Sequence, residues 1–335
     1  MSTTPTLTKA DFQSDQETRW CPGCGDYAIL AQVQATMPEL GIPPERVVFV
    51  TGIGCAGRFS YYMNTYGMHV IHGRAPAVAT GLAAARDDLS LWVVSGDGDA
   101  LSIGGNHLVH SLRRNVPVKI LLFNNRIYGL TKGQASPTSE LGKVTKSTPE
   151  GTTEPALDAV LLALASGATF VARTIDRDKQ HLGDVLRAAA AHPGAAFVEV
   201  LQNCPVFNDG VQARFVGGEA ASGRIPLVHG EPIRFGADGE MALVPDGQGS
   251  LRIAPSAEVA PADVVVHDKR SLGQALALSR IGDPVAGPLP LGIFRDVDES
   301  PWSDGTVARL REARQGLDDA AVDAMLQAGD TWTVA

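Results

Sequence analysis

The first two hundred residues alternate between helix-like and strand-like patterns of apolar side chains. Helical spacing predicts helices over residues 26–37, 75–88, 103–114, 155–166 and 181–191. Short apolar runs that predict buried strands lie at residues 47–50, 89–95, 118–123, 169–174 and 196–201. Strands that alternate with helices in this way predict an α/β fold, with a parallel sheet covered by helices on both faces.

The pattern weakens from about residue 206. Short strand-like pieces at 233–235, 241–244 and 251–253 are separated by Gly and Asp turns, and helices are predicted at 272–280 and 306–327. We therefore expect residues 1–215 to form the main domain. Residues 216–335 are expected to form an irregular C-terminal extension or subdomain.

Composition excludes several classes of protein. The formal net charge is −9 and the isoelectric point is about 5.4, so nucleic acid is not an expected partner. No apolar run has the length of a membrane span, and residues 1–20 lack the apolar core of an export signal. We expect a cytoplasmic enzyme that contacts no membrane.

Two polar motifs follow consecutive predicted strands. Gly96-Asp97-Gly98 ends one strand, and Asn124-Asn125 ends the next. The carboxyl ends of neighbouring parallel strands lie at one edge of a sheet, where α/β proteins bind ligands. Asp97, the amide oxygen of Asn125 and a loop carbonyl such as that of Ile127 are the hard oxygen ligands that Mg²⁺ prefers. Glycines let the backbone approach phosphates closely, so the motifs predict a magnesium–diphosphate site.

Two alternatives are open for these motifs. Gly-Asp-Gly alone is a common strand-to-helix turn, and the paired asparagines one strand later favour the functional interpretation. A dinucleotide site requires G-x-G-x-x-G at the start of a helix. Gly96, Gly98, Gly104 and Gly105 do not have that spacing.

All four cysteines fall in predicted loops: Cys21, Cys24, Cys55 and Cys204. Four thiolates suit Zn²⁺ or an iron–sulfur cluster, and their wide separation disfavours a zinc ribbon. Other interpretations remain for subsets of them. Cys21 and Cys24 could form a redox dithiol, and Cys55 or Cys204 alone could be a small buried residue.

The Gly-Asp-Gly and Asn-Asn motifs resemble the thiamine-diphosphate-binding motif. Together with the cysteines, residues 15–215 resemble the β subunit of 2-oxoacid:ferredoxin oxidoreductases. The resemblance implies a diphosphate-binding type of thiamine fold in which Asp97, Asn125 and the Ile127 carbonyl bind Mg²⁺. It also implies that Cys21, Cys24, Cys55 and Cys204 bind one [4Fe-4S] cluster. The resemblance does not extend to the C-terminal extension, which we separately expect to pack on the cluster region or on the partner subunit.

The resemblance also implies contacts to the thiamine cofactor. The residues concerned are Ile53, Gly54, Cys55, Ala56, His72, Gly96, Asp97, Gly98, Asp99, Asn125, Gly129 and Leu130. His72 would reach the diphosphate or the reacting centre. Arg58 and Lys132 are cations in the site loops, and a basic residue at Lys132 looks like the 2-oxoglutarate type of the family. We expect both to select a substrate with a second carboxylate.

The activity implied by the resemblance is oxidative decarboxylation of 2-oxoglutarate with coenzyme A to succinyl-CoA and CO₂. Electrons would pass through the cluster to ferredoxin, and the reverse carboxylation is also possible. Pyruvate or another 2-oxoacid is the alternative substrate, and a zinc-stabilised binding or structural subunit is the alternative of another class. Only one thiamine-type domain is visible, so an α subunit is expected to complete the site in an αβ or (αβ)₂ heterotetrameric assembly.

Overall fold

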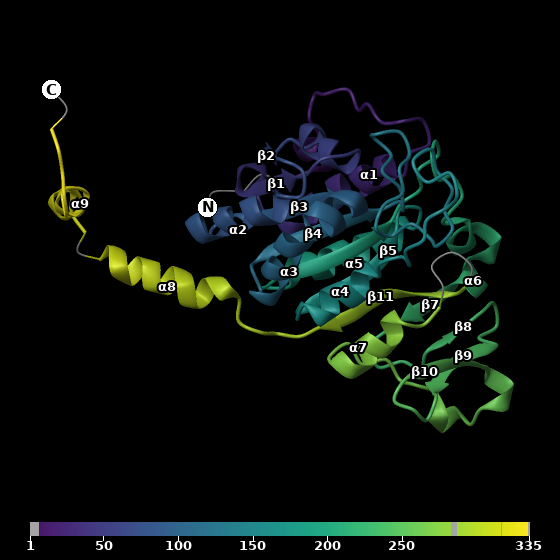
Figure 1. Cartoon of the computed structure of the whole chain (residues 1–335). Helices are drawn as coiled ribbons and strands as arrows, with labels where there is room; N and C mark the ends of the chain where they lie inside the picture. The colour runs from purple at the N-terminus through teal and green to yellow at the C-terminus, as the bar shows by residue number, and fades with distance from the viewer. Residues whose placement is uncertain (1–6, 283–286, 316, 334–335) are drawn as a thin grey trace.

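The computed structural model describes residues 7–282, 287–315 and 317–333. Within these residues the main sheet has the strand order β2-β1-β3-β4-β6-β5-β11-β7 (Figure 1). Neighbouring strands are parallel except for β11, which is antiparallel to β5. The strands are β1 (Val47–Thr51), β2 (Tyr66–His69), β3 (Ser90–Gly96), β4 (Val118–Asn124), β5 (Phe170–Ile175), β6 (Ala196–Leu201), β7 (Arg224–Leu227) and β11 (Leu289–Asp296). The predicted α/β fold is confirmed.

Helices cover both faces of this sheet (Figure 1). The helices of one face are α1 (Asp26–Thr36) and α5 (Lys179–Ala191); those of the other are α2 (Ala75–Ala85), α3 (Gly105–Arg113), α4 (Ala159–Ala165) and α7 (Leu272–Ser279). Alternate residues of each strand point to opposite faces of the sheet, and each face has its own hydrophobic core. Trp92 and Val94 pack on the α1 and α5 side, whereas Val93 packs on the other.

Three strands of the main sheet were not predicted from the sequence. All four residues of β2 are exposed, so this edge strand has no apolar pattern. β7 and β11 contain Pro226, Pro290 and Gly292, which are residues typical of turns. The predicted helix over 103–114 begins only at Gly105, because residues 99–103 form a wider helical turn.

The C-terminal part contributes to the main sheet and also forms a small antiparallel one. The small sheet contains β8 (Arg234–Phe235), β9 (Met241–Pro245) and β10 (Leu251–Pro255), in the order β10-β9-β8. The predicted helix over 306–327 is instead two helices, α8 (Trp302–Arg314) and α9 (Asp319–Leu326), which project from the body (Figure 1). The boundary between residues 215 and 216 stays a prediction; β7 and β11, which follow it, lie in the main sheet.

The parallel strands bring the loops that carry the sequence motifs to one edge. Residues 52–57 follow β1, residues 97–99 follow β3, residues 125–134 follow β4 and residues 202–207 follow β6. Because these four strands are consecutive in the sheet, in the order β1-β3-β4-β6, the four loops lie along one edge of it. Among the described residues, no helix is long and apolar enough to cross a membrane.

Beneath this edge lies a buried ion pair between β5 and β6. The Arg173 Nε donates to Glu199 Oε2 over 2.5 Å, and both side chains are almost fully buried. Glu199 Oε1 also accepts from Asn124 Nδ2 over 2.6 Å. Because Asn124 is the last residue of β4, the ion pair holds the end of this strand in place.

Arg173→Met should strongly destabilise the chain because it leaves the buried Glu199 carboxylate without its cation. Loss of one partner of a buried pair costs about 3–5 kcal/mol. Arg187→Met is the matched control: Arg187 pairs with Glu39 at the surface, and exposed pairs contribute about 0–1 kcal/mol. Urea unfolding of both variants measures the difference. Equal losses of stability would contradict the role given to the buried pair.

Candidate active site

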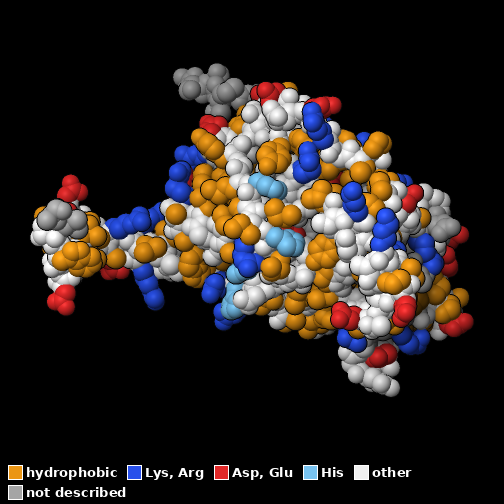
Figure 2. Space-filling view, turned by 45° about the horizontal axis from the view of Figure 1, so that its top comes forward, with side chains coloured by type: hydrophobic (Ala, Val, Ile, Leu, Met, Phe, Trp, Pro, Cys, Tyr) orange, Lys and Arg blue, Asp and Glu red, His pale blue; other side chains and the backbone are white. Residues whose placement is uncertain are grey.

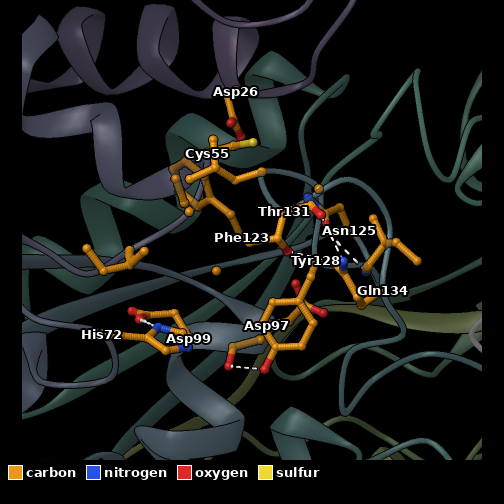
Figure 3. A pocket seen from close by; sticks show the side chains of 18 residues that line it. Asp26, Cys55, His72, Asp97, Asp99, Phe123, Asn125, Tyr128, Thr131 and Gln134 are labelled. Carbon is orange, nitrogen blue, oxygen red and sulfur yellow. Dashed lines mark hydrogen bonds and ion pairs between the residues drawn. The ribbon is translucent and has the colours of Figure 1, made fainter. Parts of the chain in front are cut away.

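A pocket of about 530 Å³ opens where the loops meet (Figure 3). Every residue expected to contact the cofactor lines it: Ile53, Gly54, Cys55, Ala56, His72, Gly96, Asp97, Gly98, Asp99, Asn125, Gly129 and Leu130. Ile127, the expected carbonyl ligand, lines it too. The structure thus brings together residues from three strand ends. Their individual roles stay predictions.

Asp97 is buried at the bottom of this pocket, with 2% of its surface exposed. Burial raises the pKa of its carboxyl group, because a low dielectric disfavours the charged form. The Thr138 hydroxyl lies 2.7 Å from Asp97 Oδ2 and 2.9 Å from Asn124 Oδ1. It therefore ties this carboxyl group to the end of β4.

Asn125 lies in a constrained turn beside Asp97. Arg126, which follows it, is buried and has a φ of 60°, a left-handed conformation that is uncommon for residues other than glycine. The Ile127 backbone N–H donates to Asn125 Oδ1 over 3.2 Å, and Asn208 Nδ2 donates to the Asn125 carbonyl oxygen over 2.9 Å. Backbone strain of this kind persists where the surroundings hold it in place, often at functional sites.

Asp99 organises the opposite wall of the pocket. It is buried and accepts hydrogen bonds from the Gly73 backbone N–H over 2.7 Å and from Ser95 Oγ over 2.5 Å. It also pairs with His72 Nδ1, which orients the imidazole ring toward the pocket (Figure 3). Only glycine fits at residue 52, because a Cβ on Gly52 would lie 1.7 Å from Asp99 Oδ2. His72 is thus a held, partly exposed ring on the pocket wall.

These features fit a diphosphate with a divalent cation. A buried carboxyl group and an amide oxygen lie at neighbouring strand ends, and glycines line the wall between them. A Cβ on Gly98 would meet the Tyr128 ring at 2.2 Å, so the close approach of these two loops requires glycine. Asp97 and Asn125 could supply oxygen ligands to Mg²⁺.

A second cavity of about 320 Å³ adjoins the first and is lined by all four cysteines. The two cavities share Cys55, Asn125, Gly129 and Leu130 as a common wall. A Cβ on Gly129 would lie 3.5 Å from Cys204 Sγ and 3.7 Å from Cys55 Sγ, so the two sulfurs lie close to the same point. The distant cysteines of the sequence therefore surround one space.

Four thiols line the cysteine cavity, and these are the donor groups that an iron–sulfur cluster uses. Among the described residues, no three His, Cys, Asp or Glu side chains converge closely enough to hold one metal ion. A four-iron cluster is larger than an ion, so its ligands lie farther apart. Burial raises the pKa of the Cys55 thiol to about 12 and also raises that of Cys24. Positively charged iron would favour the thiolates that burial disfavours.

Arg58 and Lys132 do not lie on the larger pocket. Both line the cysteine cavity, where Arg58 Nε donates to the Tyr62 hydroxyl over 3.1 Å and the Lys132 side chain is exposed. Lys132 has a φ of 79° and precedes Gly133 in a tight turn. Their expected role in substrate selection stays a prediction.

Several pocket residues escaped the sequence interpretation: Asp26, Phe123, Tyr128, Thr131 and Gln134. Three of these lie in the segment 127–154, whose length without periodicity signalled a functional loop. Asp26 follows the Cys21–Cys24 pair by two residues and points toward Cys55 (Figure 3). Burial, together with the nearby Asp176 carboxylate, raises the pKa of its carboxyl group to about 7.

Asp26→Asn should increase the thermal stability of the metal-free chain at pH 8 more than at pH 5. The folded-state pKa is raised, so ionising Asp26 costs folding free energy as the pH rises from about 4 to about 7. Asparagine has the same shape as aspartate but does not ionise, so the variant loses no folding free energy as the pH rises. Melting temperatures at the two pH values test this, with the exposed Asp87→Asn as control. A pH-independent shift would contradict the assignment.

Comparisons with known proteins agree with this geometry. Residues 52–200 match the family model of the C-terminal TPP-binding domain of thiamine pyrophosphate enzymes. The chain is 55% identical to the 2-oxoglutarate oxidoreductase subunit KorB of Mycobacterium tuberculosis, over 97% of this chain and 88% of that protein. It is 45% identical to the β subunit of 2-oxoacid:ferredoxin oxidoreductase 1 of Aeropyrum pernix, over 62% of this chain and 65% of that one.

A solved structure matches along nearly the whole chain. The 2-oxoglutarate:ferredoxin oxidoreductase from Magnetococcus marinus, with 2-oxoglutarate, coenzyme A and succinyl-CoA bound, superposes with a TM-score of 0.76. The match is 32% identical and covers 97% of this chain and 98% of that chain. The chain therefore belongs to the family of 2-oxoacid:ferredoxin oxidoreductase β subunits.

Proposed function

We propose that this chain is the β subunit of a cytoplasmic 2-oxoglutarate:ferredoxin oxidoreductase that depends on thiamine diphosphate. With its α subunit it would convert 2-oxoglutarate and coenzyme A to succinyl-CoA and CO₂, and pass the electrons to ferredoxin. The observation that carries the proposal is the wall shared by the two cavities. It supports the proposal because the pocket that could hold a diphosphate adjoins the cavity that all four cysteines line, and the relatives' names supply the substrate.

The two bound groups would supply different chemistry: thiamine diphosphate provides an electron sink for decarboxylation, and a [4Fe-4S] cluster accepts electrons singly. Asp97, Asn125 and the Ile127 carbonyl would hold Mg²⁺ on the diphosphate. Cys21, Cys24, Cys55 and Cys204 would hold the cluster. Gly129 keeps the shared wall thin, since any side chain there would contact both Cys55 and Cys204. His72, fixed by Asp99, would orient the diphosphate or the reacting group.

The proposed function is tested by co-expression with the α subunit and anaerobic purification. We expect about four iron and four sulfide per chain, bound thiamine diphosphate, and reduction of methyl viologen that requires both 2-oxoglutarate and coenzyme A. Zinc in place of iron, or decarboxylation by this chain alone, would refute it.

Thr138→Val should raise the Mg²⁺ concentration needed for thiamine diphosphate binding by about 10- to 100-fold, as loss of a hydrogen bond to a metal ligand does. Its hydroxyl is the partner that fixes Asp97 Oδ2. Thr138→Ser retains the hydroxyl and should bind almost normally. Thr145→Val, in the same loop but bonded only to neighbouring loop residues, is the control. Equal Mg²⁺ dependence of the two valine variants would contradict the role of Thr138.

Lys132 and Arg58 are the proposed determinants of selectivity for a dicarboxylic 2-oxoacid. Lys132→Ala should lower the ratio of kcat/KM for 2-oxoglutarate to that for pyruvate by about 10- to 100-fold, the value of a charged hydrogen bond. Steady-state assays with both acids measure the ratio. If it does not change, Lys132 does not contact the second carboxylate.

The α subunit is proposed to cover the mouth of the larger pocket. Exposed apolar side chains lie beside it, among them Ile71, which is 77% exposed, Ile103 and Leu130; Tyr66 and Met68 continue the apolar surface along β2. Apolar area of this kind marks an interaction surface.

Ile71→Asp should weaken assembly with the α subunit, because it places a charge in the centre of that apolar surface. We expect the affinity between the subunits to fall by about 10-fold or more. Gel filtration at decreasing concentration measures the loss. Val228→Asp, at an apolar residue of the C-terminal part that is 48% exposed, should assemble normally, and equal dissociation of both variants would count against the proposed surface.

A further inference from the structure

Gln202 is a buried polar side chain on the wall of the cysteine cavity. It follows the last residue of β6, lines the cavity, and has only 1% of its surface exposed. Its Nε2 donates to the Asn203 carbonyl oxygen over 2.6 Å and to Cys24 Sγ over 3.3 Å. The two amide hydrogens thus have one acceptor each, and one of these acceptors is the sulfur of a proposed cluster ligand.

The orientation of this amide group is fixed by its neighbours. A carbonyl oxygen only accepts hydrogen bonds, so a reversed amide would place Gln202 Oε1 against the Asn203 carbonyl oxygen with no hydrogen between them. Nε2 therefore faces Asn203 and Cys24. The stem of the side chain is held as well, because a Cβ on Gly25 would lie 2.9 Å from Gln202 Cγ.

Folding stability does not explain a glutamine at this position. Within the described residues, the buried Gln202 Oε1 has no hydrogen-bond partner. An unsatisfied buried acceptor costs about 1–3 kcal/mol of folding free energy. Such groups in native structures call for another explanation, for example a redox role. The end of the side chain that is satisfied is the one that faces Cys24.

The surroundings of Cys24 make a neutral donor important there. The carboxyl group of Asp26 also lies near this sulfur. An ionised carboxylate only accepts hydrogen bonds, and its negative charge disfavours further electron density on a neighbouring thiolate. Gln202 therefore supplies the side-chain N–H that stabilises negative charge on Cys24 Sγ.

We propose that Gln202 is a positioning residue that acts through Cys24 and raises the reduction potential of the [4Fe-4S] cluster. The inference rests on the proposed function, in which Cys24 is one of the four cluster ligands. Reduction adds one electron to such a cluster, and part of the added charge lies on its cysteine sulfurs. A donor that faces one of these sulfurs stabilises the reduced form more than the oxidised form.

Gln202→Met should make the cluster harder to reduce, because methionine has a similar length but no N–H. We expect the equilibrium constant for one-electron reduction to fall about 10-fold, which lowers the potential by about 59 mV. The Asn203 carbonyl oxygen keeps a donor, the Gly25 backbone N–H at 3.1 Å, so the fold should tolerate the change. A redox titration of the anaerobic αβ complex, followed by electron paramagnetic resonance and accompanied by iron analysis, measures the potential.

Gln34→Met is the matched control. Gln34 is also buried, and its Nε2 donates to the Tyr62 carbonyl oxygen over 2.9 Å, but it does not line the cysteine cavity. This variant loses a buried hydrogen bond without removing a donor from a sulfur, so its cluster potential should not change. An unchanged potential in Gln202→Met, or an equal shift in both variants, would overturn the proposal.

A measurement on the unmodified complex decides the matter if Gln202→Met loses its iron. The complex is labelled with nitrogen-15 only in the side-chain amides of glutamine. Electron spin-echo spectra of the reduced cluster should then show coupling to nitrogen-15, because Gln202 Nε2 is bonded to a ligand sulfur. Absence of this coupling would overturn the proposal. Failure of the proposed function would be seen separately, as absence of iron from the unmodified complex.

Discussion

The burial of Asp97 is the constraint on which the rest of the site depends. A carboxyl group taken out of water at a strand end is costly unless a hydrogen bond or a cation stabilises it. The fold supplies a chain of buried hydrogen bonds that runs from Asp97 through Thr138 and Asn124 to Glu199, and ends at Arg173. The ligand-facing carboxyl group is thereby fixed by three strands of the sheet, and the pocket above it fits a diphosphate with its metal.

The second constraint is the shared wall. Cys55 and Gly129 belong to loops after β1 and β4, and the strand order places these loops over the same part of the sheet edge. Gly25 brings the Cys21–Cys24 loop into the same place: its backbone N–H donates to the Asn203 carbonyl oxygen over 3.1 Å. A Cβ there would lie 1.9 Å from Asp176 Oδ2. Close packing of loops, rather than any single motif, makes the two cavities neighbours.

Sequence patterns predicted the features that follow from regular geometry. Buried parallel strands have continuous apolar runs and their ends converge, so Asp97 and Asn125 could be placed together before the structure was known. The sequence did not predict β2 or β11, which lack that pattern. Thr138 and Asp26 were missed because one lies in an aperiodic loop and the other owes its raised pKa to burial, which is a tertiary property. The position of Lys132 on the cysteine cavity depends on a left-handed turn that no spacing reveals.

The two cavities of the site differ in the chemistry of the residues that border them. The larger pocket is bordered by exposed apolar residues such as Ile71, which suit a partner that stays bound and excludes water from the reaction. The lining of the cysteine cavity differs, because it includes three cationic side chains, those of Arg19, Arg58 and Lys132. The buried acids Asp26, Asp97 and Asp99 line the larger pocket. Carboxyl groups are thus concentrated in the pocket where cationic groups would bind.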